Sequence, residues 1–253
     1  MSADEVARRR TQMGEAIRGW GAIPGAVSEV SDGHWLLLSG APSPDVNLVL
    51  VHSSDGEVLE AALATVNRVG APSLVCLAGE ASEEGLASSW QAVGTMPFMQ
   101  ADLAAVPQGV DQRVRVAGPD DVEVAVDLLM EAYGMDQVVA RIAVEPVLTG
   151  LTEGSSDMRY WLLVEDGVPV STVLDARAED VITLWCMGTP ERFGRRGFGR
   201  ALLAHVLHAA RQDGMTEGLL GATPAGKPLY EATGWRTVEE WRLFVNAASV
   251  QFA

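Results

Sequence analysis

The residues best suited to chemistry lie between Val181 and Gly199, in the segment VITLWCMGTPERFGRRGFG. An apolar run over 181–187 predicts a strand, and the Gly-Thr-Pro sequence that follows predicts its end. The next stretch is rich in arginine and glycine: Arg192, Gly194, Arg195, Arg196, Gly197, Gly199 and Arg200. This composition indicates a site for an anion.

The elements on either side strengthen that interpretation. Apolar residues recur at helical spacing after the loop, at 202, 203, 206, 207 and 210. A strand, a glycine-rich loop and a helix together bind phosphate well, because the loop amides point at the anion and the helix dipole adds positive charge. An ordinary strand-to-helix turn that happens to be basic is the alternative.

A second motif, GATPAGKPLYEATGW, occupies 221–235. The arginine–glycine loop followed by Pro-Leu-Tyr-x-x-x-Gly-Trp resembles the GNAT superfamily of acyl-CoA-dependent N-acyltransferases. In that family the first motif cradles the pyrophosphate of coenzyme A, and the tyrosine lies beside the sulfur. The resemblance implies transfer of an acetyl group from acetyl-CoA to an amine.

The resemblance also implies which residues bind the cofactor. Main-chain groups at the splayed end of the strand bind the thioester carbonyl and pantetheine, and here these belong to Cys186, Met187 and Gly188. The loop residues are Gly194, Arg195, Arg196, Gly197, Phe198, Gly199 and Arg200. Gly194 stands where the family has arginine or glutamine, so one side-chain contact is missing while the amide cradle is kept. Each arginine has the alternative of being a solvated surface charge.

Tyr230 matches the family tyrosine that acts as general acid toward the departing thiolate. A phenol with an ordinary pKa near 10 is protonated at neutral pH and can donate to sulfur. The alternative for Tyr230 is a purely packing role. Thr223 replaces a serine that often precedes the proline, and we expect it to bond the cofactor. Cys186 is an alternative nucleophile, although its apolar strand and the lack of a nearby histidine disfavour that role.

The general base is left open. Glu131, Asp136 and Asp175 are candidates by position, and a water chain is a further alternative. His205 and His208 fall off the apolar stripe of their helix, so we expect them to be solvated. No Cys/His cluster has the spacing of metal ligands, and no metal is expected.

The composition limits the function classes. The chain has 253 residues, 48% of them hydrophobic, and a formal net charge of −16. That charge argues against nucleic acid and is compatible with an amine-bearing substrate. No apolar run is long enough to span a bilayer, and no secretory signal follows the first charged residues. Only Cys76 and Cys186 are present, which fits reduced thiols in a cytoplasmic protein.

The second half predicts a mixed α/β (α+β) fold. Helices are expected over 122–133, capped by Asp120 or Asp121, and over 137–148. The segment 159–177 predicts a hairpin around Glu-Asp-Gly, and further strands are expected to end at 187, to cover 219–222 and to cover 235–245. A helical turn is expected over 226–232. This order matches the GNAT domain from about residue 110 onward.

The first half predicts a similar order of elements without the cofactor loop. Helices are expected over 4–20, 57–69 and 83–93, with Arg8, Arg9 and Arg10 outside, and strands over 34–39, 47–52, 73–79 and 95–103. This half resembles the degenerate N-terminal half of tandem GNAT proteins. A polar segment over 104–118 places the boundary, giving domains 1–107 and 108–253.

Three function classes follow from the resemblance. They are an N-acetyltransferase for a small-molecule amine, a protein lysine or N-terminal acetyltransferase, and a non-catalytic acyl-CoA-binding module. An N-terminal half that covers the cleft favours a small, enclosed substrate. No membrane partner is expected, and a homodimer stays open.

Overall fold

The fold is built on one mixed sheet. The computed structural model describes residues 2–107, 109–151, 154 and 157–246, and within them eleven strands follow the order β1-β2-β3-β4-β11-β5-β10-β9-β8-β7-β6. The strands are β1 (Val27–Val30), β2 (His34–Leu38), β3 (Asn47–Val51), β4 (Leu74–Leu77), β5 (Trp90–Asp102), β6 (Val114–Val116), β7 (Asp157–Glu165), β8 (Val168–Ala178), β9 (Val181–Gly188), β10 (Glu217–Gly221) and β11 (Arg236–Asn246). Only the β3–β4 and β9–β10 pairs are parallel.

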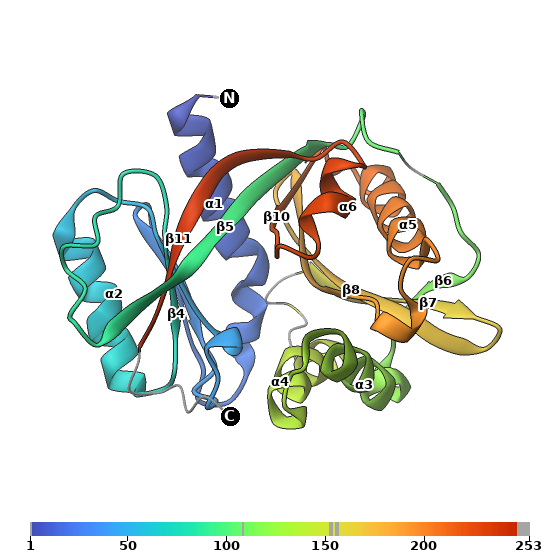
Figure 1. Cartoon of the computed structure of the whole chain (residues 1–253), viewed down its shortest axis with the longest axis horizontal. Coiled ribbons are helices and arrows are strands. Elements are labelled where there is room, and N and C mark those ends of the chain that lie inside the picture. Colours follow the sequence, from blue (N-terminus) through green and yellow to red (C-terminus); the bar gives the residue numbers. More distant parts are fainter. Residues whose placement is uncertain (1, 108, 152–153, 155–156, 247–253) are drawn as a thin grey trace.

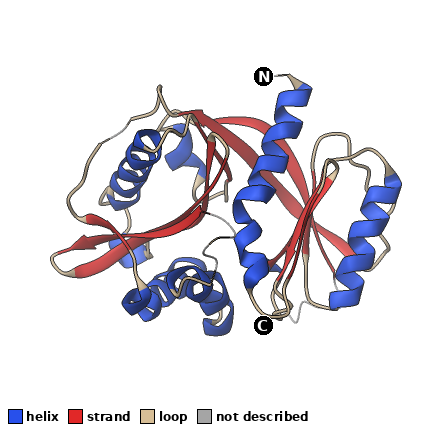
Figure 2. Ribbon diagram, turned by 180° about the vertical axis from the view of Figure 1, so that it is seen from behind, coloured by secondary structure: helices blue, strands red, loops and turns tan. Residues whose placement is uncertain are grey.

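Helices cover the sheet on both faces. They are α1 (Ala3–Ile17), α2 (Gly56–Val69), α3 (Val122–Tyr133), α4 (Gln137–Leu148), α5 (Phe198–Gln212) and α6 (Lys227–Glu231), with short 3-10 turns η1 (Arg18–Ala22), η2 (Pro44–Val46), η3 (Pro119–Asp121) and η4 (Glu191–Phe193). In the second half, α3 and α4 lie on one side of the strands and α5 and α6 on the other (Figure 1). Figure 2 shows α1 running between the two halves.

The last strand joins the halves. β11 lies between β4 and β5 and pairs antiparallel with both, and β5 also pairs with β10. The long strands β5 and β11 run side by side across the molecule (Figure 1). The boundary predicted at 107/108 falls between β5 and β6; the division into two domains stays a prediction.

Local signals account for several elements. The Asp55 carboxylate accepts the Glu57 amide at 3.0 Å and starts α2, and Gly70 ends that helix with a φ of 72°. The β7–β8 hairpin turns at Asp166 and Gly167, with φ of 50° and 79°. Positive φ at both positions is the type I′ geometry that matches the twist of the strands.

Three expectations are corrected, and one strand was missed. The predicted helix over 83–93 is wrong, because β5 already begins at Trp90, where its pairing with β11 outweighs local helical spacing. Strand β1 was not predicted. The helix expected over 4–20 ends at Ile17 and continues as η1. The Asp121 carboxylate does not cap α3; it accepts the Gly118 amide at 2.9 Å and pairs with Arg115.

The arginines of α1 are a further correction. Arg9 and Arg10 were expected to lie outside the fold, yet they are 3% and 7% exposed. Arg9 pairs with Asp180 at 3.0 Å and with Glu217 at 2.9 Å, and the Arg10 Nε donates to Glu239 at 2.7 Å. These carboxylates belong to the second half, so α1 is held to that half by buried charge pairs that no local pattern reveals.

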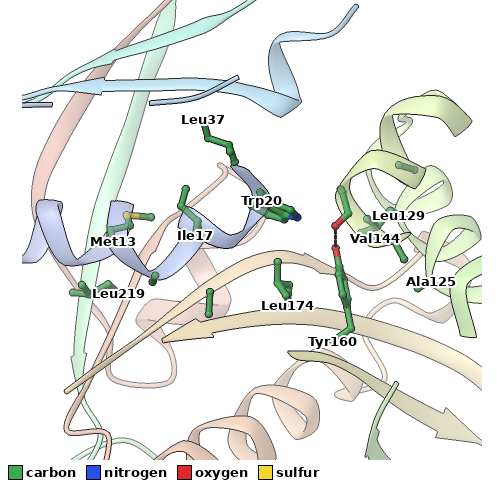
Figure 3. Close-up of a cluster of buried hydrophobic side chains, with 14 of the residues drawn as sticks. Met13, Ile17, Trp20, Leu37, Ala125, Leu129, Val144, Tyr160, Leu174 and Leu219 are labelled. Carbon is green, nitrogen blue, oxygen red and sulfur yellow. Dashed lines mark hydrogen bonds between the residues drawn. The ribbon is translucent and has the colours of Figure 1, made fainter. Parts of the chain in front are cut away.

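One apolar cluster packs against both halves. Met13 and Ile17 of α1 and Trp20 of η1 lie near Leu37 of β2 on one side and Leu174 of β8 on the other (Figure 3). The same cluster extends to α3 and α4. Among the described residues, no helix is both long and apolar enough to cross a membrane.

Candidate active site

The end of β9 is bulged and separated from β10. The parallel pairing between these strands stops at Thr183 and Leu219, so the remaining residues of β9 do not pair with β10. Across from β8, the register passes from Leu174–Trp185 to Thr172–Gly188, which leaves Cys186 and Met187 opposite the single residue Val173. Cys186 has a φ of 50°, a conformation that costs a non-glycine residue roughly 1–2 kcal/mol.

The bulge directs side chains to two different faces. Trp185 and Cys186 pack with the cluster that contains residues of α1, α3 and α4. Leu184 and Met187 pack with the cluster that contains α5 and Tyr230. The splayed strand end therefore contacts the helices on both sides of the sheet.

Tyr133, at the end of α3, was missed by the sequence analysis. Its hydroxyl donates to the Met187 carbonyl oxygen at 2.7 Å. Burial of the hydroxyl, with a smaller contribution from Cys186, raises the pKa of this phenol well above its usual value, although the ring as a whole is 40% exposed. The only sequence signal was its place at the end of a predicted helix, which does not reveal that the helix ends against β9.

The arginine–glycine loop presents free amides. Arg195 and Gly197 have φ of 59° and 83°, and the first bond of α5 runs from the Ala201 amide to the Gly197 carbonyl. Within the described ranges, none of the amides from Arg195 to Arg200 donates a hydrogen bond. Unpaired amides at a helix start, together with the helix dipole, form an anion-binding cradle. Gly197 fits here because glycine adopts positive φ without strain.

Three guanidinium groups surround this cradle. Arg195, Arg196 and Arg200 are exposed, and none has a carboxylate of the described residues within 4.0 Å. The Arg196 guanidinium lies 4.7 Å from the centre of the Phe198 ring. Arg192 differs, because it pairs with Glu131. In a chain with a net charge of −16, three unpaired cations at one helix start indicate an anionic ligand.

The loop, the strand end and α6 converge at Gly199. A Cβ atom built there would lie 3.4 Å from the Thr189 Oγ1, 3.5 Å from the Leu229 Cδ2 and 3.6 Å from the Met187 Cε. The Thr189 hydroxyl is also hydrogen-bonded to Ser171 at 2.8 Å, which fixes the end of β9. The cradle and the bulge thus form one continuous site.

Tyr230 reaches the same point from α6. It is 7% exposed, and its hydroxyl lies 3.4 Å from the Met187 Sδ. Burial raises the pKa of this phenol, so it holds its proton throughout the physiological range. The Thr223 hydroxyl accepts the Gly226 amide at 3.1 Å, and its expected bond to the cofactor stays a prediction.

The Cys186 side chain is a protonated thiol. Burial raises its pKa to about 11, although a hydrogen bond from Tyr160 acts in the opposite direction. A thiol with such a pKa is a poor nucleophile at neutral pH. Both cysteines are free in the structure.

We expect Cys186→Ala to keep acetyl transfer. The change retains a Cβ at the bulge and removes only the sulfur, so kcat should stay within about threefold of the wild-type value. Steady-state thiol release, together with a search for acylated protein by mass spectrometry, checks this. A loss of several orders of magnitude would instead assign a covalent role to the thiol.

The three carboxylates proposed as bases are not brought together. Glu131 is paired with Arg192, and Asp136 caps α4 by accepting the Val138 amide at 2.8 Å. Asp175 is buried between Trp161 and Arg177, at 2.9 and 3.1 Å, and burial raises its pKa. Each carboxylate therefore has a structural partner.

One of the two histidines on α5 is not solvated as expected. His205 was expected to be solvated, but its Nδ1 accepts the Asp111 amide at 3.0 Å and its ring packs edge-on to Trp161. Within the described ranges, no three His, Cys, Asp or Glu side chains meet as a metal site.

Residues 103–225 match the family model of the acetyltransferase (GNAT) domain. The matched segment holds the end of β9, the arginine–glycine loop and α5, and makes up just under half of the chain. No curated protein sequence matches the chain.

Solved GNAT structures resemble the whole chain. A GCN5-related N-acetyltransferase from Kribbella flavida shares 20% identity at a TM-score of 0.63, with 94% of this chain and 95% of that one covered. A tandem GNAT protein from the clavulanic acid biosynthesis pathway shares 14% identity at a TM-score of 0.56, with 96% and 95% covered.

A third likeness covers only part of the other protein. It is to a glucosamine N-acetyltransferase region in a fungal multi-domain β-N-acetylglucosaminidase, with 13% identity, a TM-score of 0.54 and coverage of 97% of this chain and 37% of that one. At these identities the likenesses establish the fold alone, and that fold extends across both halves, as in a tandem GNAT protein.

Proposed function

We propose that this GNAT protein transfers the acetyl group of acetyl-CoA directly to the amine of a small molecule. The observation that carries the proposal is the start of α5, where six amides have no hydrogen-bond acceptor and three exposed arginines have no carboxylate partner among the described residues. A pyrophosphate has the charge and size for such a cradle. The neighbouring bulge of β9 offers main-chain groups to the rest of the coenzyme A molecule.

The proposed roles follow from these positions. The free amides from Arg195 through Phe198 to Arg200, with the three guanidinium groups, hold the pyrophosphate, whereas the Gly194 amide donates to the Glu191 carbonyl oxygen at 2.8 Å. Main-chain groups of Cys186, Met187 and Gly188 orient the pantetheine arm, and Thr223 lies beside it. Acetyl-CoA supplies an activated acetyl thioester when bound.

Tyr230 is the proposed general acid. Its hydroxyl is buried at the end of β9 and its nearest polar neighbour is the Met187 sulfur. A phenol that keeps its proton can donate it to the coenzyme A sulfur as the thiol forms. No side chain is assigned as the base, because the candidate carboxylates already have other partners.

The acceptor is proposed to be small. The N-terminal half packs against α4 through η1 and η2, which leaves a narrow cavity beside β9 in place of an open groove for a peptide. The likeness to a glucosamine N-acetyltransferase region agrees with a small amine. Neither nucleic acid nor a membrane is a proposed partner, given the net charge of −16.

We also propose different roles for the two halves of the chain. Residues 108–253 carry the cradle and Tyr230, whereas residues 1–107 have no arginine–glycine loop after their SLVCLAG strand. The first half is therefore proposed to bind no cofactor and to shape the acceptor side.

A thiol-release assay with acetyl-CoA and a panel of amines tests the function. We expect release that depends on one class of small primary amines, and one coenzyme A bound per chain by calorimetry. Release with lysine-containing peptides alone would favour a protein substrate. Tight binding with no release would favour a regulatory module, and a stoichiometry of two would contradict the assignment of the first half.

A further inference from the structure

A cavity on the acceptor side of β9 is formed by both halves of the chain. It lies between η1, η2, α4 and the bulge, with Trp20, Asp45, Ile142, Trp185 and Cys186 among its lining residues. Its volume is about 60 Å³. The cavity is therefore small and admits a slender group in preference to a bulky one.

The lining is largely apolar, with Asp45 and Ser39 as its polar exceptions. Trp20 and Trp185 meet edge to face with ring centres 6.2 Å apart, and Trp20 is 6% exposed. Asp45 supplies the one charged side chain of the lining. Within the described residues it accepts a hydrogen bond from the Ser43 hydroxyl at 3.0 Å and has no cationic partner. A carboxylate without a cation beside two indole rings has the chemistry to bind an ammonium group.

The indole N–H of Trp20 is a second unsatisfied group. It is buried and has no hydrogen-bond partner among the described residues.

A wider hollow adjoins the cavity at Ile23 and Ile142, which line both. It has a volume of about 490 Å³ and is lined largely by the outer side of α4. Val138, at the edge of this hollow, is 57% exposed. A narrow cavity opening into a wide apolar hollow fits a molecule with a slender end and a bulkier apolar body.

We infer that the acetyl acceptor is a primary amine on an unbranched methylene, attached to an apolar body, with its ammonium bound by Asp45. The inference rests on the proposed function for the reaction itself. The cavity ends at Cys186, one residue from Met187, where Tyr230 approaches from the opposite face. An α-carboxylate on the acceptor would meet both the narrow walls and the like charge of Asp45, so amino acids are excluded.

The test uses 2-phenylethylamine as the probe and 2-phenylethanol as its uncharged analogue, with the full chain and no acetyl-CoA. Tryptophan fluorescence and calorimetry report binding. We expect the wild-type chain to bind the amine roughly tenfold more tightly than the alcohol, a moderate preference because Asp45 is exposed and solvent screens its charge. Equal binding of the two, or no detectable binding of the amine, overturns the inference.

Asp45→Asn keeps the acceptor of the Ser43 hydrogen bond and removes the charge. It should abolish the preference for the amine, and in turnover it should raise KM for 2-phenylethylamine about tenfold while kcat and acetyl-CoA affinity stay unchanged. Glu60→Gln, on the exposed side of α2, is the matched control and should behave as wild type. Phenylalanine should be a poor substrate for all three proteins.

Failure of the Asp45 inference and failure of the proposed acetyl transfer would give different results. Thiol release from amines that is indifferent to Asp45→Asn overturns the inference and leaves the proposed function intact. Amine binding that depends on Asp45 without any thiol release supports the cavity assignment and contradicts acetyl transfer.

Discussion

Gly199→Asp is expected to abolish acetyl-CoA binding, with the dissociation constant rising at least about 100-fold, since one carboxylate in the cradle opposes the pyrophosphate charge directly. The side chain would enter the point where the loop, β9 and α6 converge. Isothermal titration calorimetry with acetyl-CoA and with coenzyme A measures the change.

The folded state should survive this substitution. An aspartate in the first turn of α5 interacts favourably with the helix dipole, by roughly 0.3–1 kcal/mol, so Tm should be unchanged or slightly higher. Gly199→Ala is the matched control, because its Cβ would meet its neighbours at 3.4–3.6 Å, an ordinary contact distance. It should bind acetyl-CoA nearly as well as wild type. Unchanged affinity in the aspartate variant would place the pyrophosphate elsewhere.

Tyr230→Phe should lower kcat by about 10²–10⁴-fold, the usual contribution of general-acid assistance. The lower end is expected, because a thiol with a pKa near 8.5 leaves fairly well without help. For the same reason the deficit should shrink as the pH rises toward that value. Acetyl-CoA affinity should be unchanged, as measured by calorimetry beside a kcat profile from pH 6.5 to about 9.

Stability separates a chemical from a packing role of Tyr230. The hydroxyl has only the Met187 sulfur as a polar neighbour, and the ring keeps its contact with Trp235 in the variant. Tm should therefore change little. Tyr133→Phe is the control for the second phenol at the site, and its kcat should fall less than about tenfold. A Tyr230 variant with wild-type turnover across the pH range would falsify the general-acid assignment.

Local sequence patterns predicted the elements that carry the site. The strand ending near Met187, the helix after the loop and the hairpin of β7 and β8 were predictable, because their signals are glycine chemistry and periodicity within a short window. The glycine-rich start of α5 was predictable for the same reason. Its agreement with the free amides of Arg195–Arg200 shows how much a glycine-rich helix start determines by itself.

Features that depend on distant parts of the chain were not predictable. The charge pairs of Arg9 join residues far apart in sequence, and the Tyr133–Met187 hydrogen bond joins the end of α3 to the end of β9. Asp45 enters the acceptor cavity only because η2 packs against α4. A local pattern contains no information on such contacts. The residues around the cavity beside β9 therefore could not be predicted, whereas the arginine–glycine loop could.

The position of β11 has a consequence for synthesis on the ribosome. β4 ends at Leu77, but its partner in the sheet begins only at Arg236, so the edge of β4 stays open while the intervening chain is made. At about 5–20 residues per second, that interval lasts roughly ten to thirty seconds. An open strand edge invites pairing with other nascent chains. The first half therefore cannot complete its sheet until β11 has been made, and its yield should depend on chaperones that cover the open edge of β4.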